Sequence, residues 1–195
     1  MLKRCLVLGF LLIVSALALA ACGSGNGEEG QIEEVVETSA TSTDPADCKE
    51  LSTQQFMEQI AQTEGAEAVK TCEKEASEET GAKSADVSNI EVDGSKATAE
   101  VALTGGGLDG QDVEVALVKQ GDQWKLNEIT GFTKFDQAKV VETLEKGFDE
   151  PSSEVSKSLA SCIVKSFEEA PQAEFEEALL STSSDGFEEI AGGCF

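Results

Sequence analysis

The 195-residue sequence contains no histidine and no tyrosine, and it has a single tryptophan. Without histidine, a Ser-His-Asp triad cannot be built, and no Gly-x-Ser-x-Gly elbow occurs. General acid–base chemistry would depend on Asp or Glu with a raised pKa. The hydrogen-bond donor that stabilises an oxyanion would have to be another acid, Asn127, Trp124 or backbone N–H groups. No residue pattern points to such a site, so the sequence predicts a protein that is not an enzyme.

Cations are also scarce, because 14 lysines and arginines stand against 38 acidic residues, a net charge of −24. So acidic a chain is soluble and repels nucleic-acid phosphates and anionic headgroups. The sequence therefore predicts no nucleic-acid partner. A basic partner or loose calcium binding would also be consistent with the negative charge. The usual explanation of such a charge is a scatter of acidic residues on solvated helix faces.

The first 22 residues have the order of an export signal. Lys3 and Arg4 precede an apolar run over 6–14, and small residues then lead to Leu19-Ala20-Ala21-Cys22. This segment resembles the lipobox of bacterial lipoproteins, in which the cysteine becomes the first mature residue and carries lipid. We expect a signal peptide over 1–21 and lipidation of Cys22; an ordinary cleaved signal or an uncleaved anchor are the alternatives.

Lipid on Cys22 implies a place at the cell membrane, on its extracytoplasmic face, with membrane lipid as the first partner. Gly23 is not an aspartate, so no inner-membrane retention signal is seen. Loss of Lys3 and Arg4 with the signal leaves 12 cations against 38 anions, a charge of −26. Residues 22–30 are rich in Gly, Ser and Glu, which predicts a flexible tether.

Six cysteines are present, but none forms a Cys-x-x-Cys pair, which disfavours a zinc site or a redox centre. Cys5 lies in the signal and Cys22 carries lipid. The other four are expected to form two disulfides outside the cytoplasm. Three connectivities exist, and we favour the one that joins neighbours in each half, with about 3.5 kcal/mol of stabilisation per bond. These pairs are Cys48–Cys72 and Cys162–Cys194.

Apolar spacing changes twice along the chain. Helical spacing predicts a short helix around Ile32, a segment carrying Cys48, a helix opened by Ser52, and a further helix carrying Cys72. For the helix opened by Ser52, we expect a capping box with Gln55, a staple between Leu51 and Phe56, and a buried stripe of Phe56 and Ile60.

From Val87 the period becomes two, which predicts four strands around 87–92, 97–103, 113–117 and 124–129. Asp93-Gly94 and Gly121-Asp122 are expected hairpin turns. After Phe135 helical spacing returns. The expected fold is α+β: N-terminal helices packed on a curved four-stranded antiparallel sheet over 31–135, followed by a small all-helical unit over 136–195.

The order of these elements, with the strand-turn-strand motif Val118-Lys119-Gln120-Gly121-Asp122-Gln123-Trp124-Lys125-Leu126, resembles the cystatin-like, nuclear transport factor 2-like superfamily. More narrowly, the chain is similar to small secreted lipoproteins of that superfamily with no assigned function. The resemblance covers about residues 30–135. It implies a helical layer on a curved sheet that forms a ligand-holding cone, and it carries over no catalytic residue.

Three further features have ordinary structural interpretations. Trp124 could stack on a ligand, but a lone aromatic residue on an alternating strand usually belongs to the core. The glycines from 105 to 110 lack a phosphate-loop lysine, so they predict a hairpin loop. Asp109, Asp112 and Glu114 could offer oxygens to calcium, but their spacing fits no known calcium loop. We therefore predict neither a metal nor a cofactor.

Two classes of function remain. We favour a non-catalytic binding module for a hydrophobic small molecule or an envelope protein. The alternative is a small isomerase-like or dehydratase-like enzyme that uses a buried carboxylate. An Asp or Glu that points into an apolar cavity with a strongly raised pKa would favour the enzyme.

Overall fold

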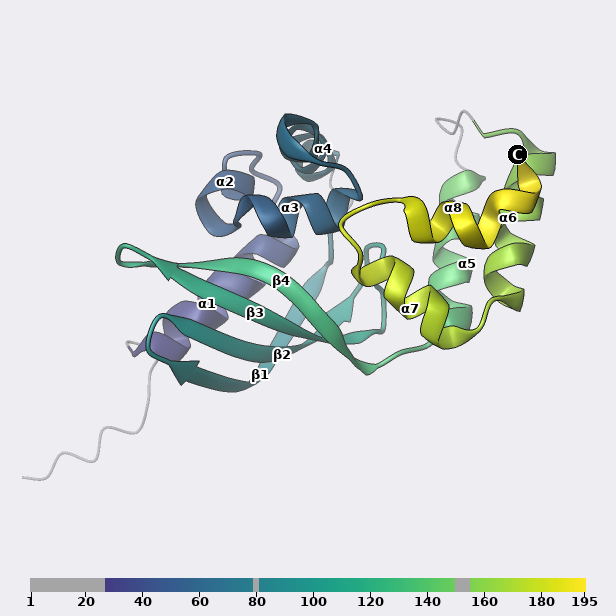
Figure 1. Ribbon diagram of the computed structural model, residues 1–195. Coiled ribbons are helices and arrows are strands. Elements are labelled where there is room, and N and C mark those ends of the chain that lie inside the picture. Colours follow the sequence, from purple (N-terminus) through teal and green to yellow (C-terminus); the bar gives the residue numbers. More distant parts are fainter. Residues whose placement is uncertain (1–26, 79–80, 150–154) are drawn as a thin grey trace, which may run out of the picture.

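The computed structural model describes residues 27–78, 81–149 and 155–195. Helices come first, a four-stranded antiparallel sheet follows, and further helices end the chain (Figure 1). The fold class is therefore α+β, as the sequence predicts. The elements are α1 (Glu28–Thr41), α2 (Asp47–Leu51), α3 (Gln54–Ala61), α4 (Gly65–Ser77), β1 (Ser84–Asp93), β2 (Lys96–Thr104), β3 (Asp112–Gln120), β4 (Gln123–Lys134), α5 (Gln137–Phe148), α6 (Lys157–Glu169), α7 (Gln172–Leu180), α8 (Asp185–Ala191) and the 3-10 turn η1 (Gly192–Cys194).

The sheet is a meander in the order β1-β2-β3-β4. Val101 of β2 lies between Val87 of β1 and Val113 of β3, so one face is apolar. Gly94 and Gly121 open the two tight hairpin loops with φ of 63° and 65°. A glycine with positive φ at this position matches the right-handed twist of the strands. The first loop is Gly94-Ser95, one residue later than predicted, because Asp93 still pairs with Lys96.

Irregular pairing curves the sheet. In β1 the register shifts between Ser88 and Glu91, and Asn89 adopts a left-handed φ of 50°. The β3–β4 pairing shifts at three further places. Bulges of this kind bend a strand and increase its twist. The curvature leaves the inner face concave toward the helices.

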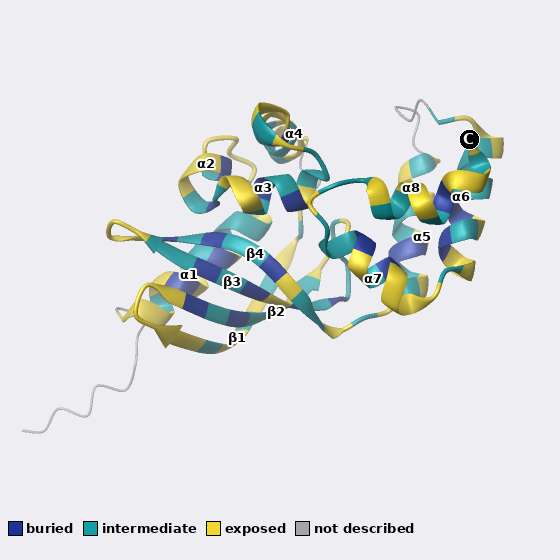
Figure 2. Cartoon of the chain, in the orientation of Figure 1, coloured by how far each residue is buried: buried dark blue, intermediate teal, exposed yellow. Residues whose placement is uncertain are grey.

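Helix α1 crosses the inner face and contacts both edge strands, β1 and β4 (Figure 1). Ile32 and Val36 are buried on its sheet-facing side, one turn apart, as the sequence spacing predicts. They pack in a core with residues such as Ala99, Val115 and Leu117, which alternate on the strands. Figure 2 shows buried positions alternating with more exposed ones along β2, β3 and β4.

The prediction of a flexible tether over 22–30 is wrong for residues 28–30, because α1 begins at Glu28. Glu28 and Glu29 lie in the first turn, where acids stabilise the helix dipole. Ile32, one turn further along, is fully buried in the core, so packing also stabilises this end of the helix. The predicted signal peptide over 1–21 and the lipidation site Cys22 lie outside the described residues. Within the part of the chain that is described, no helix is long and apolar enough to cross a membrane.

The start of α3 also differs from the prediction. Thr53, not Ser52, is the N-cap, and its Oγ1 accepts the N–H of Phe56 at 3.3 Å. Ser52 is buried and forms a bridge to Leu126 of β4, and the Thr53 N–H donates to the Leu126 carbonyl at 2.8 Å. Pairing with the edge strand therefore moved the cap by one residue, an interaction that local spacing does not reveal.

The C-terminal helices form a second cluster of buried residues around Val140, Val164 and Phe175. Phenylalanine rings join it to the sheet: Phe132 of β4 lies 4.6 Å from Phe135, and Phe135 lies 6.1 Å from Phe175, measured between ring centroids. Figure 1 shows α5–α8 beyond one end of the sheet. The helical unit is therefore docked on the sheet through aromatic packing.

Candidate functional site

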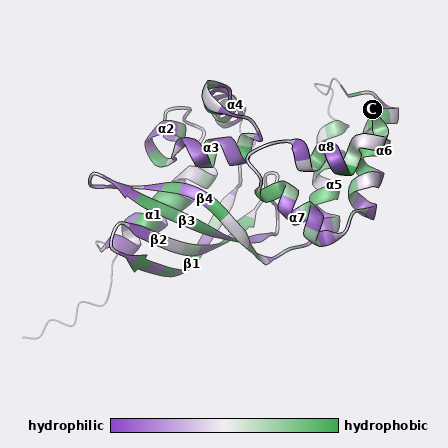
Figure 3. Ribbon diagram, in the orientation of Figure 1, coloured by the Kyte–Doolittle hydropathy of each residue, from purple (hydrophilic) through white to green (hydrophobic). Residues whose placement is uncertain are grey.

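A cavity of about 690 Å³ lies between the concave face of the sheet and the helices. Its lining is mostly apolar and comes from both halves of the chain. Figure 3 shows hydrophobic residues on the strands and on the inner sides of the helices. Cavities of this size and composition are typical of small-molecule sites. This cavity is the candidate functional site.

The floor of the cavity consists of alternating residues of the sheet. Val101 of β2, Val113 and Val115 of β3, and Leu126 and Ile129 of β4 line it. Successive side chains of a strand point to opposite faces, so the period of two places Val113 and Val115 of β3 inward together. Leu126 and Ile129 are three residues apart, and the irregular pairing with β3 between Ala116 and Leu117 returns both to the inner face. The period of two over 97–103 and 113–117 therefore predicts this inner face, whereas the irregularity in β4 was not predicted.

Helix α3 forms one wall, but its buried side is not the predicted one. Met57 and Gln59 are buried, while Phe56 is half-buried and Ile60 is 43% exposed. All four residues line the cavity. Of the predicted stripe, Phe56 packs against the edge of the core and also borders the cavity, whereas Ile60 is exposed at the cavity and leaves apolar surface for a ligand.

The glycine loop between β2 and β3 forms another wall. Gly105 and Gly106 have φ of 78° and 68°, and a Cβ on Gly106 would lie 3.0 Å from backbone atoms of Gly81 and Ala82. Only glycine allows this close approach of two backbones without strain. The loop is a hairpin connection, as predicted, and it also borders the cavity, which was not predicted.

Asp109 stabilises this loop. Its Oδ1 accepts the Gly105 N–H at 2.6 Å, and its Oδ2 lies 3.2 Å from the Lys139 Nζ. These two contacts, the first of them foremost, hold the pKa of Asp109 below its usual value. The carboxylate is therefore committed to the loop and to α5.

The C-terminal helices close the remaining side. Residues of α5, α6, α7 and α8 contribute to the lining, namely Val140, Leu144, Phe167, Leu179, Leu180 and Phe187. The sequence treats 136–195 as a separate unit, whereas the structure makes it part of the cavity wall. Spacing within one helix cannot reveal which distant surface that helix will meet.

Gln59 of α3 joins this wall to the sheet, and Gln62, the C-cap of the same helix, also binds the wall. Gln59 is 2% exposed, accepts the Ile129 N–H at 2.7 Å, and donates to the carbonyls of Ile129 at 2.9 Å and Leu180 at 2.7 Å. Gln62 donates to the Ser181 carbonyl at 2.6 Å. Sequence reasoning missed both residues, because a polar side chain at a helical position is expected to face water.

Three carboxylates border the cavity: Asp44, Asp47 and Glu75. Loss of water around Glu75 raises its pKa, although Lys74 opposes the shift. The residue as a whole is nonetheless exposed, so Glu75 is a carboxylate at the rim and not a buried one. Among the described residues, the buried polar side chains are Ser52, Gln59 and Gln111, and none of them is acidic.

The structure contains both predicted disulfides, Cys48–Cys72 and Cys162–Cys194. Cys48 and Cys72 also line the cavity and join α2 to α4, with 6.1 Å between their Cα atoms. Cys162 and Cys194 join α6 to η1, with a corresponding distance of 5.7 Å. The first bond therefore shapes the cavity wall, and the second holds the end of the helical unit.

Trp124 belongs to the core, as predicted, because it is 2% exposed and lies outside the cavity lining. The residues considered for calcium have separate partners. Asp109 binds Lys139, Asp112 lies 4.0 Å from Lys134, and Glu114 accepts the Thr130 hydroxyl at 2.7 Å. Across the described ranges, no three His, Cys, Asp or Glu residues are grouped as a metal site would require.

Comparisons of the chain with protein-family models, with curated proteins and with solved structures find no match. The geometry of the cavity is therefore the basis for the functional argument.

Proposed function

We propose that the chain is a lipoprotein anchored through Cys22 at the extracytoplasmic face of the cell membrane, and that its folded part binds a hydrophobic small molecule without converting it. The single observation that supports binding is the apolar cavity of about 690 Å³. Burial of apolar ligand surface there is worth about 25 cal/mol per Å². The half-exposed Phe56 and Ile60 lie where a ligand would cover them.

Two exposed hydrophobic residues offer a matched test of binding. Ile60 lines the cavity and is 43% exposed, whereas Val92 on β1 is 37% exposed and lies outside the lining. Ile60→Gln should weaken binding of a neutral apolar fluorescent dye several-fold, and Val92→Gln should leave it unchanged. Equal effects of the two variants, or no dye binding by the parent protein, would contradict the proposal.

Native mass spectrometry of the protein purified from its own envelope separates the two kinds of binding partner. A co-purifying small mass supports a ligand in the cavity. A stoichiometric protein with an empty cavity would instead favour an interaction module.

The enzyme alternative requires a carboxylate inside the cavity. Glu75 at the rim is the acid with a raised pKa that comes nearest to this requirement. Turnover of a carbonyl or hydroxy-acid substrate that disappears in Glu75→Gln would overturn the non-catalytic proposal.

The anchor has its own test, which rests on Leu19-Ala20-Ala21-Cys22. Cys22→Ala should abolish incorporation of labelled fatty acid and release or stall the precursor. Cys5→Ala is the matched control, because this cysteine lies in the predicted signal peptide, and it should leave labelling intact. Continued labelling of the Cys22→Ala variant would show that the anchor is elsewhere.

A further inference from the structure

All ionisable side chains that line the cavity have the same sign. Asp44, Asp47 and Glu75 border it, and its described lining contains neither lysine nor arginine. A fatty acid or a phospholipid headgroup would meet no cation there. Electrostatic complementarity between a site and its ligand mainly determines specificity. The sign of this lining therefore carries information about the ligand.

The acidic side chains gather where α2 meets α4. Asp47 is next to Cys48 in α2, and Glu75 follows Cys72 of α4 by three residues, which is about one helical turn. The disulfide between the two cysteines brings these turns together. The Asp47 Oδ2 accepts the Ser42 hydroxyl, which also borders the cavity. One end of a mostly apolar cavity is therefore acidic.

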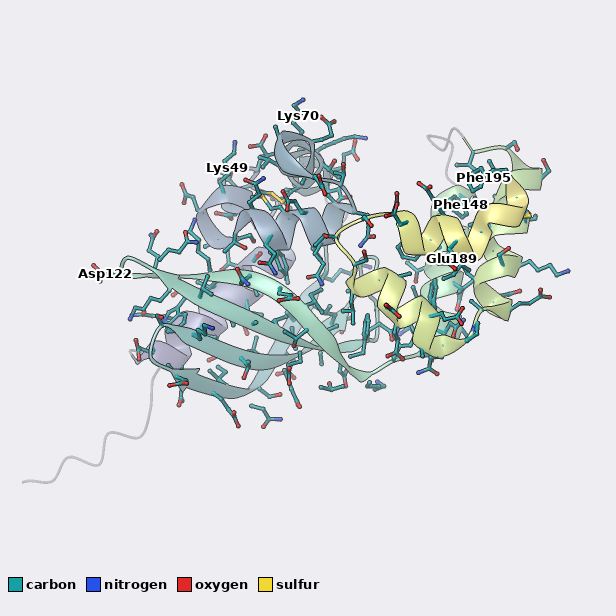
Figure 4. The ribbon with its side chains drawn as sticks, viewed as in Figure 1. Lys49, Lys70, Asp122, Phe148, Glu189 and Phe195 are labelled. Atoms are coloured by element: carbon teal, nitrogen blue, oxygen red, sulfur yellow. A yellow bond between two sulfur atoms is a disulfide. The ribbon has the colours of Figure 1, made fainter. Side chains whose placement is uncertain are left out.

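The lysines of this region lie on its outer side. Figure 4 shows Lys49 and Lys70 on the outer surface of the α2–α4 layer, away from the sheet. Lys49 binds Glu73 at 2.6 Å, and Lys70 binds Glu67 at 3.1 Å. Lys74 acts on Glu75 but lies 3.8 Å from Glu78. Lys49 and Lys70 are thus paired with acids that do not line the cavity, whereas Lys74 acts on both Glu75 and Glu78.

A neutral acceptor adds to this pattern. The Oε1 of Gln62 is buried without a hydrogen-bond partner among the described residues, and Gln62 lines the cavity. An unsatisfied buried acceptor costs about 1–3 kcal/mol, which a donor on a ligand would recover. Gln62 precedes α4 and Glu75 lies near the other end of that helix, so this acceptor is separate from the acidic end. The charge of the acidic end by itself favours a ligand that carries positive charge.

Resting on the proposed binding function, we infer that the cavity binds a cationic amphiphile: an apolar chain with a protonated amine at the end lined by Asp44, Asp47 and Glu75. The apolar chain of the ligand covers the floor of the cavity. The amine exchanges its water molecules for hydrogen bonds to carboxylate oxygens. Charge-assisted hydrogen bonds are shorter and about twice as strong as neutral ones. Carboxylate and phosphate amphiphiles are disfavoured because like charges repel at the same end.

Three probes with one chain length test the inference on the mature, disulfide-bonded protein. Dodecylamine and dodecanoate, each below its micelle concentration, and dodecanol, below its solubility limit, are titrated by calorimetry at pH 7. Dodecylamine should bind about tenfold more tightly than dodecanol, a difference of about 1.4 kcal/mol, and dodecanoate should bind most weakly. The double variant Asp47→Asn with Glu75→Gln should lose the preference for the amine and keep its affinity for dodecanol.

The net charge of the whole chain needs a matched control, because a net negative protein attracts any cation. Glu100 and Glu114 lie opposite each other on β2 and β3, outside the cavity lining. Glu100→Gln with Glu114→Gln removes the same charge and should retain the amine preference. Its loss in this control would assign the preference to bulk charge and overturn the inference.

The remaining outcomes separate the two proposals. Equal binding of the three probes would overturn the inference about the headgroup and leave the apolar site standing. Tightest binding of dodecanoate would also overturn it. No binding of any probe would instead contradict the proposed function.

Discussion

Gln59 offers the most direct test of how the two halves of the chain are joined. Its buried amide makes three hydrogen bonds of 2.7–2.9 Å to backbone groups of Ile129 and Leu180. Gln59→Leu keeps a side chain of similar size and removes all three. One N–H and two carbonyl groups then lose the Gln59 amide as their hydrogen-bond partner, and the leucine side chain occupies the space that the amide filled.

The cost follows from the number of groups left unsatisfied. Each costs about 1–3 kcal/mol, and we take the lower end because the adjoining cavity admits water, which gives about 3 kcal/mol in total. For a chain of this length, such a loss lowers Tm by about 6–12 °C. Urea unfolding at pH 7 with both disulfides intact measures the free energy directly.

Gln55 supplies the matched control, because it is an exposed glutamine of the same helix whose Nε2 donates to Glu128 at 3.2 Å. Gln55→Leu should change the free energy of unfolding by less than about 0.5 kcal/mol. Hydrogen exchange adds a local readout, since the Ile129 amide should lose protection in the Gln59 variant only. Equal stability of the two variants would refute the reasoning that Gln59 joins the sheet to α7.

Three further outcomes are expected. Replacing Cys162 and Cys194 together by serine should lower the free energy of unfolding by about 3.5 kcal/mol in urea titrations, because the disulfide restricts the unfolded chain. A change below about 1 kcal/mol would contradict this loop-entropy estimate. Asp109→Asn should lower Tm at pH 7. Because the pKa of Asp109 is lowered in the folded state, the carboxylate stabilises the fold fully above pH of about 4 and loses this effect as pH falls through the folded-state pKa. The Tm values of parent and variant should therefore converge as the pH is lowered, and a constant difference would be the contrary result. Gly106→Ala should destabilise the fold by about 1–2 kcal/mol, because φ is 68° and the new Cβ would lie too close to backbone atoms. Gly107→Ala should be tolerated, because no atom lies within 4 Å of its Cβ. Similar melting curves for the two variants would show that the loop adjusts to the added Cβ.

Local pattern determined the elements of this protein. Alternation of Ala97, Ala99 and Val101 placed β2 and its inward face, and the spacing of Ile32 and Val36 placed the sheet-facing side of α1. These inferences succeed because the period of a strand or a helix is a property of its own backbone. The α+β class followed from the order of the periods, and the two disulfides agreed with the preference for near neighbours.

Tertiary structure decided the site. Ile60 looked like a core residue, but the helical unit packs so that it borders an open cavity, and Gln59 looked like a surface residue but lies buried. The glycine loop, the rim acid Glu75 and helices α5–α8 became walls of that cavity only after distant segments met. A sequence records which face of each element is apolar, whereas the space left between faces depends on sheet curvature and docking, which arise from contacts across the whole chain.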